Sequence, residues 1–436
     1  MQAPQPDFGP GKCSVYFIGE LGAVRPVSRN VPNLGPRVTI VDNKGKRISR
    51  LGGLGPDLGP TEFLAPHGLA VDSHDDSVRC TCVGSAVDPQ GFDMVVTRWG
   101  FVRWAAAAGG AFMLSSAMTL GATAADDKTY VMKIALATFE DALHQYAKNY
   151  AAAVERDSGG RIKAEIYPAS QLGSIARQAE GVQFGAIQCQ IVAPEFLAGV
   201  DERFEVLAAP GLVTSMADGQ RVAANLGVMK LMLGLGADKG LHGAGLFMNS
   251  QSAVIARTPI HHLADFKGKK IRIFASQFQS VAMQRLGATP KPMTLAGVLP
   301  ALQDNALDGA VSSIAVFSAM HYEKAAKYVT ETGQPAIFGI AEVSKKWYDS
   351  LPTDLQQIVD KDAASEATAI NPQAIEINDR ARKAWMNGGG ELISLPADEQ
   401  SAMLETLASV GEDVSKTKPQ LSAAYLVATE AAQSRR

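Results

Sequence analysis

One arginine, Arg272, stands at a position where a side chain could bind an anion. It lies in the stretch KIRIF at residues 270–274, in which Arg272 alternates with Ile271 and Ile273. Successive side chains of a strand point to opposite faces, so the two isoleucines share one face and Arg272 projects from the other. A planar guanidinium can hold a carboxylate through two parallel hydrogen bonds. The pattern alone leaves open whether Arg272 binds such a ligand, is solvated at the surface or pairs within the protein.

The sequence has none of the residue patterns that mark common catalytic or metal sites. It contains no G-x-S-x-G nucleophile motif, no P-loop and no H-E-x-x-H zinc motif. Cys80 and Cys82 are too few ligands for a zinc site by themselves. His261 and His262 are adjacent, so they cannot share one face of a helix as metal ligands. We therefore predict a binding protein that is not an enzyme and holds neither a metal nor a cofactor.

The elements that must position Arg272 are predicted to form two successive α/β units. The first has the order strand, helix, strand, helix, strand, which predicts a parallel sheet. Its elements are expected at 129–137, 139–160, 161–170, 177–187 and 187–193. A second, smaller unit begins after Ser252. Its elements are expected at 270–274, 277–286 and 288–293, with a helix and a strand within 298–311. The pattern then predicts helix over 347–382, a strand within 388–396 and a last helix over 397–412.

The overall composition is that of a soluble globular protein of two or three domains. The chain has 436 residues, of which 46% are hydrophobic and 19% charged. Its net charge of −3 gives no electrostatic basis for binding nucleic acid or an anionic membrane. We therefore expect a small-molecule partner and no nucleic-acid partner.

Residues 98–127, RWGFVRWAAAAGGAFMLSSAMTLGATAADD, have the layout of a secretory signal peptide. Two arginines precede an apolar run over 104–120, and small residues follow at 122–124. The run is shorter than the roughly 20 strongly apolar residues of a membrane span. We predict a cleavable signal within 94–125 and no stable membrane insertion after its removal. An uncleaved anchor and a buried helix are the alternatives.

The residues before this segment, 1–93, are rich in glycine and proline and are predicted to be largely irregular. RVTIVDNKGKRI at 37–48 and FLAPHGLAVDS at 63–73 read as a hairpin and a strand that resemble one repeat of the NHL-type β-propeller family. The sequence after Asp72 does not continue that strand pattern. Either the similarity is accidental, or a propeller fragment is fused to an exported protein that begins at Met94. In the second case the mature protein is periplasmic, whereas translation from Met1 would impair export.

Six ordered blocks resemble the extracytoplasmic solute receptors of TRAP transporters, the DctP-like family, over about 128–415. The blocks are EGVQFGAIQ (180–188), VDERFEVLAAPGLV (200–213), DFKGKKIRIFAS (265–276), LGATPKPM (286–293), ALQDNALDGAV (301–311) and WYDSLPTDLQQIVDKDA (347–363). The resemblance implies a two-lobed clamp of α/β class with mixed or parallel sheets and a long helix that braces both lobes. It also implies a receptor that captures an organic acid and delivers it to the small and large membrane subunits of a transporter driven by an ion gradient.

The resemblance assigns the ligand carboxylate to Arg272, because family receptors carry an arginine in a K-[ILV]-R strand. Ser312 stands where many family members have a ligand-contacting asparagine. The segment 248–256, which often carries a second arginine, has none, and Gly297 replaces a common glutamate. One clear cation favours a monocarboxylate, such as a keto, hydroxy or aromatic acid, over a diacid.

Five further residues are secondary candidates for contact with the ligand: Glu195, Gln251, Ser252, Phe139 and His144. Glu195 is suited to bind a ligand hydroxyl, but a capping or surface role fits it equally well. Phe139 and His144 follow the first strand and could line the cleft, although His144 also fits the exposed face of a helix.

The blocks predict a domain order. Lobe I covers 126–250 and lobe II covers 251–333, after which 334–382 returns to lobe I with the connecting helix and 383–436 completes lobe II and adds C-terminal helices. A carboxylate sensor that feeds a signalling protein, or a pseudogene-like fusion with impaired export, remains an alternative function.

Overall fold

The computed structural model describes residues 128–434 and, before them, the backbone of five strands between residues 15 and 85. These strands are β1 (Val15–Glu20), β2 (Arg37–Asp42), β3 (Arg47–Leu51), β4 (Phe63–Val71) and β5 (Val78–Ser85). They pair antiparallel in the orders β1-β2-β3 and β4-β5. The predicted hairpin and strand are present. The expectation that no strand follows Asp72 is wrong, because β5 covers Val78–Ser85. Strand β5 returns along β4 through backbone pairing, which does not require the side-chain pattern of a propeller repeat. The signal-like segment 94–125 lies outside the described residues.

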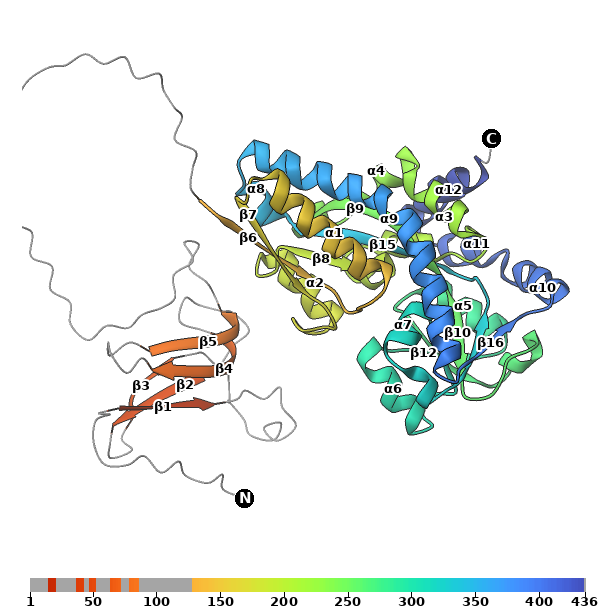
Figure 1. Cartoon of the computed structure of the whole chain (residues 1–436), viewed down its shortest axis with the longest axis horizontal. Coiled ribbons are helices and arrows are strands. Elements are labelled where there is room, and N and C mark those ends of the chain that lie inside the picture. The colour runs from red at the N-terminus through yellow and green to blue at the C-terminus, as the bar shows by residue number, and fades with distance from the viewer. Residues whose placement is uncertain are drawn as a thin grey trace, which may run out of the picture. The chain divides into compact units, whose positions relative to one another are not determined.

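Residues 128–434 contain a five-stranded sheet in the order β7-β6-β8-β15-β9 (Figure 1). Its strands are β6 (Tyr130–Ala135), β7 (Ile162–Tyr167), β8 (Cys189–Val192), β9 (Leu241–Gln251) and β15 (Ala336–Ser344). The predicted parallel pairing holds for β6 with β7 and β8. β15 joins antiparallel to both β8 and β9, so the sheet is mixed.

Helices cover both faces of this sheet. One face packs against α1 (Ala142–Asp157) and α9 (Thr353–Asn387), whose buried residues share a cluster with Met132 and Ile134. The opposite face packs against α2 (Ile175–Phe184), α3 (Met216–Ala224) and α4 (Leu226–Gly234). Short 3-10 helices η2 (Pro194–Leu197), η3 (Glu202–Ala208) and η4 (Ala237–Lys239) connect these elements. Both faces are buried, as is usual for a sheet with parallel strands.

The second sheet has six strands in the order β12-β11-β13-β10-β14-β16. They are β10 (Ala253–Ala256), β11 (Lys270–Ile273), β12 (Thr289–Pro292), β13 (Gly309–Ser312), β14 (Tyr328–Glu331) and β16 (Glu391–Ser394). Its helical elements are η5 (Leu263–Phe266), α5 (Gln277–Arg285), α6 (Leu295–Gln303), α7 (Ile314–Ala319) and η6 (Tyr322–Lys324). Phe278 of α5 and Ile271 belong to one hydrophobic cluster, and Val298 of α6 and Ile255 belong to another. The two sheets with their helices are the two lobes of a mixed α/β fold, as predicted.

Before its C-terminal helices, the chain joins the two lobes at three places. β9 runs into β10 through Ser252, β14 runs into β15 through 332–335, and α9 extends along both lobes (Figure 1). The two strand crossings are hydrogen-bonded to each other, since the Gly333 amide donates to the Ser252 carbonyl at 3.1 Å and the Ser252 amide to the Pro335 carbonyl at 3.3 Å. α9 contacts α1 and β9 in one lobe and α7 and β16 in the other. The predicted bracing helix is therefore present, after a separate short helix α8 (Lys345–Asp349).

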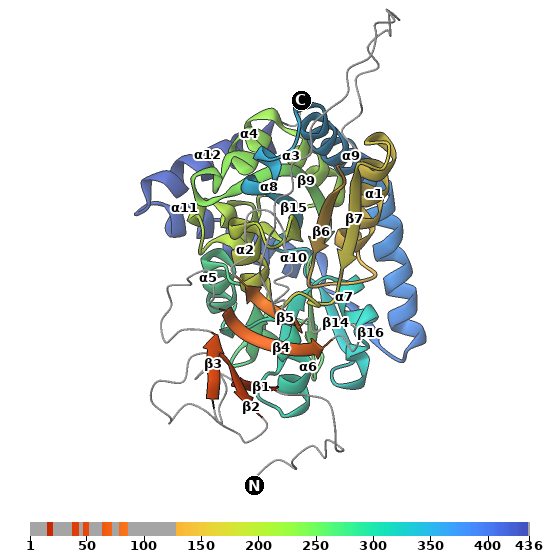
Figure 2. The ribbon, with the colours of Figure 1, turned by 90° about the vertical axis from the view of Figure 1, so that its left-hand side faces the viewer.

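The C-terminal part contains α10 (Ala397–Leu407), α11 (Val410–Ser415) and α12 (Pro419–Gln433), so the helix predicted over 397–412 is divided between α10 and α11. α11 packs on α5, whereas α12 packs on α3, α4 and η3, so the last helix lies against the lobe that holds the five-stranded sheet. Figure 2 shows α4, α11 and α12 on the side away from α1 and α9. Among the described residues, no helix is long and apolar enough to cross a membrane.

Candidate functional site

Arg272 lies at the carboxyl ends of the parallel strands β11, β12 and β13. Ile271 and Ile273 belong to the hydrophobic core, and Arg272 projects from β11 between them, as alternation predicts. Its Nε donates to the carbonyl of Met293, just after β12, at 2.9 Å, and its Nη1 donates to the carbonyl of Val311 in β13 at 3.0 Å. These backbone acceptors fix the plane of the guanidinium and leave its remaining N–H groups available.

The guanidinium of Arg272 is buried without a carboxylate partner. Only 1% of the residue is exposed, and no ion pair joins it to an acidic side chain of the described residues. Burial lowers the pKa of Arg272 to about 10, while Tyr322 and Glu195 act in the opposite direction. It therefore carries its charge at neutral pH, and a buried charge of this kind is normally paired. This residue is the strongest candidate for an anion-binding group.

A narrow cavity of about 40 Å³ runs between the two lobes at Arg272. One side is lined by residues of β11, β13 and the turns after them. The other side is lined by residues that follow β6 and β8. Its lining includes Thr138, Asp141, Val192, Ala193, Phe196, Asn249, Arg272, Phe274, Ser312 and Ser313. Carboxyl ends of strands in an open α/β sheet are where ligands bind. The volume admits a few water molecules rather than an organic acid, so a ligand needs the lobes to separate in order to enter.

Aromatic rings cover one wall of this cavity. The Phe274 ring stacks on the Phe196 ring with centroids 5.0 Å apart, and the Arg272 guanidinium lies 4.7 Å from the Phe274 centroid. Phe274 comes from the lobe of Arg272, whereas Phe196 comes from η2 in the other lobe. The contact excludes water beside the cation, and a lower local dielectric strengthens its attraction for an anion.

Glu195 is buried close to Arg272 but is not among the residues that line the cavity. Its pKa is raised to about 7, chiefly by burial and to a smaller extent by Glu205, while its own backbone amide and Arg272 act in the opposite direction. Its Oε1 accepts a long hydrogen bond of 3.5 Å from Gln279. Glu195 is therefore a buried carboxyl that acts on the field around Arg272 rather than one in position to touch a ligand.

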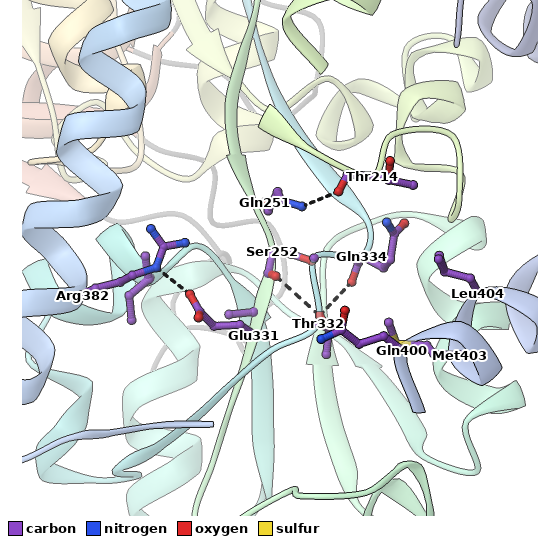
Figure 3. A pocket seen from close by; sticks show the side chains of 13 residues that line it. Thr214, Gln251, Ser252, Glu331, Thr332, Gln334, Arg382, Gln400, Met403 and Leu404 are labelled. Atoms are coloured by element: carbon purple, nitrogen blue, oxygen red, sulfur yellow. Dashed lines mark hydrogen bonds and ion pairs between the residues drawn. The ribbon is translucent and has the colours of Figure 1, made fainter. Parts of the chain in front are cut away.

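Gln251 and Ser252 lie apart from Arg272, in a second and larger cavity of about 210 Å³ at the crossing of the lobes (Figure 3). The side-chain amide of Gln251 donates to the Thr214 carbonyl at 3.0 Å, and the Ser252 carbonyl accepts from Thr332. Neither residue lines the Arg272 cavity, because Ser252 is where the chain passes from one sheet to the other, and their contact with a ligand stays a prediction. Both residues lie where the strands cross between the lobes.

Of the remaining candidates, only Ser312 is placed beside Arg272. It ends β13 and lines the same cavity. Phe139 and His144 are not part of that lining. The Nδ1 of His144 accepts from the Glu140 amide at 3.1 Å, and burial lowers its pKa. His144 is therefore engaged at the start of α1, which agrees with the alternative helical role considered for it.

Sequence reasoning missed four polar residues of the cavity, Thr138, Asp141, Asn249 and Ser313. Asp141 is the N-cap of α1, where its Oδ1 accepts from the His144 amide at 3.0 Å. Its pKa is raised to about 6 by burial, against the opposite effect of hydrogen bonds led by that of the His144 amide. A capping aspartate before an apolar helix is a readable signal. The position of Asp141 in the cleft depends on the path of the β6–α1 loop, which cannot be predicted from the sequence.

Comparison with known proteins identifies what this architecture is. The profile of the family described as "Bacterial extracellular solute-binding protein, family 7" (DctP) matches residues 136–417. The C4-dicarboxylate-binding periplasmic protein DctP of Rhodobacter capsulatus is 28% identical over 267 residues, which are 60% of this chain and 79% of that protein. The 2,3-diketo-L-gulonate-binding periplasmic protein YiaO of Escherichia coli is 26% identical over 218 residues, which are 50% of this chain and 66% of that protein.

Solved structures show the same fold. A TRAP periplasmic solute-binding protein from Desulfovibrio salexigens, with bound orotic acid, has a TM-score of 0.66 at 21% identity and covers 70% of this chain and 99% of that chain. One from Shewanella oneidensis, with bound succinate, has a TM-score of 0.65 at 20% identity and covers 70% of this chain and 100% of that chain. The profile match, the relatives and the two lobes agree: the chain belongs to the bacterial extracellular solute-binding proteins of family 7, the DctP family.

Proposed function

We propose that this chain is the extracytoplasmic receptor of a TRAP-type transporter and that it captures a small organic acid between its lobes. The observation that carries the proposal is Arg272, a buried and charged guanidinium at the carboxyl ends of the strands with no carboxylate partner among the described residues. A ligand carboxylate that enters the cleft supplies the missing counter-charge through two parallel hydrogen bonds. The relatives named above as binding C4-dicarboxylates and 2,3-diketo-L-gulonate support an acidic ligand.

Capture proceeds by closure of the lobes on the bound acid. Arg272 belongs to the six-stranded sheet, whereas Thr138 and Asp141 belong to the loop that follows strand β6 of the five-stranded sheet. A ligand that touches both sides lowers the free energy of the closed arrangement relative to the open one. Delivery to the small and large membrane subunits then depends on recognition of the closed arrangement.

A binding screen of the full-length chain tests the receptor function. Calorimetry and thermal denaturation are run with organic acids and with the uncharged amides of the same acids. We expect at least one acid to bind with micromolar affinity, about −8 kcal/mol, and to raise the Tm at millimolar concentration. The matching amide should have no effect. A folded chain that binds no acid, or binds acid and amide equally, contradicts the proposal.

We further propose that the mature protein is periplasmic after translation from Met94 and cleavage of the signal within 94–125. The periplasmic relatives and the layout of residues 98–127 support this location. Mass spectrometry of the protein from a periplasmic extract tests it. We expect an N-terminus close to Asp126, whereas peptides from 1–93 in the exported protein would exclude the Met94 start.

A further inference from the structure

The loop from β6 to α1 places two unpaired polar groups in the Arg272 cavity. Thr138 and Asp141 line the side opposite the arginine strand. The Oγ1 of Thr138 and the Oδ2 of Asp141 are both buried, and neither has a hydrogen-bond partner of normal geometry among the described residues. The two side chains nevertheless lie near enough for the Thr138 hydroxyl to favour the ionised form of Asp141. Buried polar atoms are rarely left in this state, and each requires an explanation.

Capping of α1 explains only half of the Asp141 side chain. Its Oδ1 accepts from the His144 amide, and one oxygen is all that an N-cap requires. An asparagine or serine would serve the helix equally well without a second, unpaired oxygen. At neutral pH the carboxyl of Asp141 is ionised, since burial raises its pKa only to about 6. The cavity is therefore bounded by a cation from one lobe and an anion from the other.

We propose that Asp141, assisted by Thr138, is a specificity-determining residue that selects monocarboxylates carrying a hydrogen-bond donor, either a hydroxyl or an ammonium group. This inference rests on the proposed function, because Arg272 must hold the ligand carboxylate. The hydroxyl or ammonium group then donates to the Oδ2 of Asp141, so the ligand satisfies the cation of one lobe and the acceptor of the other. A dicarboxylate is disfavoured, because its second carboxylate meets the carboxylate of Asp141 in a buried setting.

Calorimetry with matched ligands tests the selection on the full-length chain. The four-carbon set is butyrate, 4-hydroxybutyrate, 4-aminobutyrate and succinate, and analogous three- and five-carbon sets allow for different spans across the cleft. In at least one set, the wild type should bind the hydroxy or amino acid about tenfold or more tightly than both the plain acid and the diacid. This is the ratio expected for one hydrogen bond to a buried charged group.

Two variants separate selection from folding. Asp141→Asn retains a capping oxygen for α1, so we expect unchanged helicity and a Tm close to that of the wild type. It should lose the preference for the donor-bearing acid about tenfold and should bind the diacid more tightly than the wild type does. Thr138→Val, which removes only the hydroxyl, should reduce the preference in the same direction. Arg272→Gln should weaken every acid alike.

The outcomes distinguish this inference from the function on which it rests. If acids bind through Arg272 but the wild type binds the diacid at least as tightly in every set, selection by Asp141 is overturned while the receptor function stands. The same conclusion follows if Asp141→Asn is folded and keeps the wild-type ranking. If no acid binds and Arg272→Gln changes nothing, the carboxylate receptor itself is overturned.

Discussion

Replacement of Arg272 by glutamine should abolish most ligand affinity while changing stability little. Two of the five guanidinium N–H groups are already committed to the carbonyls of Met293 and Val311, which leaves three for a ligand. Two of these suffice for a paired contact with a carboxylate. Each hydrogen bond between charged groups contributes about 1.5–3 kcal/mol. The loss is therefore about 3–6 kcal/mol, which corresponds to a hundredfold to ten-thousandfold weaker Kd.

The expected stability change is small because two effects oppose each other. A pKa lowered from 12.5 to about 10 corresponds to a cost of about 3 kcal/mol for keeping the Arg272 charge buried. Glutamine removes that cost. It also leaves the Met293 and Val311 carbonyls short of donors, at about 1–3 kcal/mol each. Affinity and stability are thus affected very differently, which is the mark of a residue that serves the ligand rather than the fold.

The assay is calorimetry on the full-length chain with the acid that binds best to the wild type, together with urea denaturation of each variant. Arg272→Lys keeps the charge but not the planar pair of donors, so its affinity should fall between those of wild type and Arg272→Gln. Arg177→Gln is the matched control, because Arg177 is an exposed arginine of α2 that pairs with Glu180. A folded Arg272→Gln variant whose Kd lies within threefold of the wild type refutes the assignment.

Three further predictions concern the fold around the site. The carboxyl of Glu195 has a pKa raised by burial from 4.5 to about 7, so its contribution to stability is fully present below pH 4.5 and is lost as the pH rises to 7. Glu195→Gln should remove about 3 kcal/mol of this pH dependence of the unfolding free energy, measured by urea denaturation at several pH values. An unchanged dependence of the unfolding free energy on pH would contradict the prediction. Gly309→Ala should destabilise the chain by about 1–3 kcal/mol, because its Cβ would lie 2.4 Å from the Ile255 carbonyl oxygen. Tyr146→Phe should cost about 1 kcal/mol through loss of the 3.0 Å hydrogen bond to the Ala363 carbonyl of α9, and ligand affinity measured by calorimetry should not change.

The parts of the fold that the sequence predicted are those with a visible period. β6, α1 and β7 alternate or repeat at the spacing of their elements, and Arg272 is set off by its two isoleucine neighbours. β15 has no such period, since all nine of its residues are buried. A continuous apolar run reads equally as a buried strand or a helix segment. The antiparallel strands that complete the first sheet were therefore missed.

The candidate site divides in the same way. Arg272 and Ser312 lie at the ends of short strands that were predicted along the chain, and the structure brings them into one cavity. Asp141 was missed because the sequence shows only that it caps α1. The direction in which its second oxygen, Oδ2, points depends on the path of the β6–α1 loop, which the sequence does not reveal. Charge balance across a cleft is a property of two lobes together, and no single stretch of the sequence contains it.

The position of Gln251 and Ser252 outside the Arg272 cavity has a specific physical cause. Within one strand, alternation would carry the face of Asn249, which lines the Arg272 cavity, on to Gln251. At Ser252, however, the chain leaves the five-stranded sheet for the six-stranded one, and β15 shifts its register against β9 between Ile337 and Phe338. The side chains therefore turn into the larger cavity between the crossing strands (Figure 3). Since the two crossings are hydrogen-bonded to each other, any separation of the lobes must bend both together. We therefore expect residues at this point to act on ligand binding through the opening of the cleft.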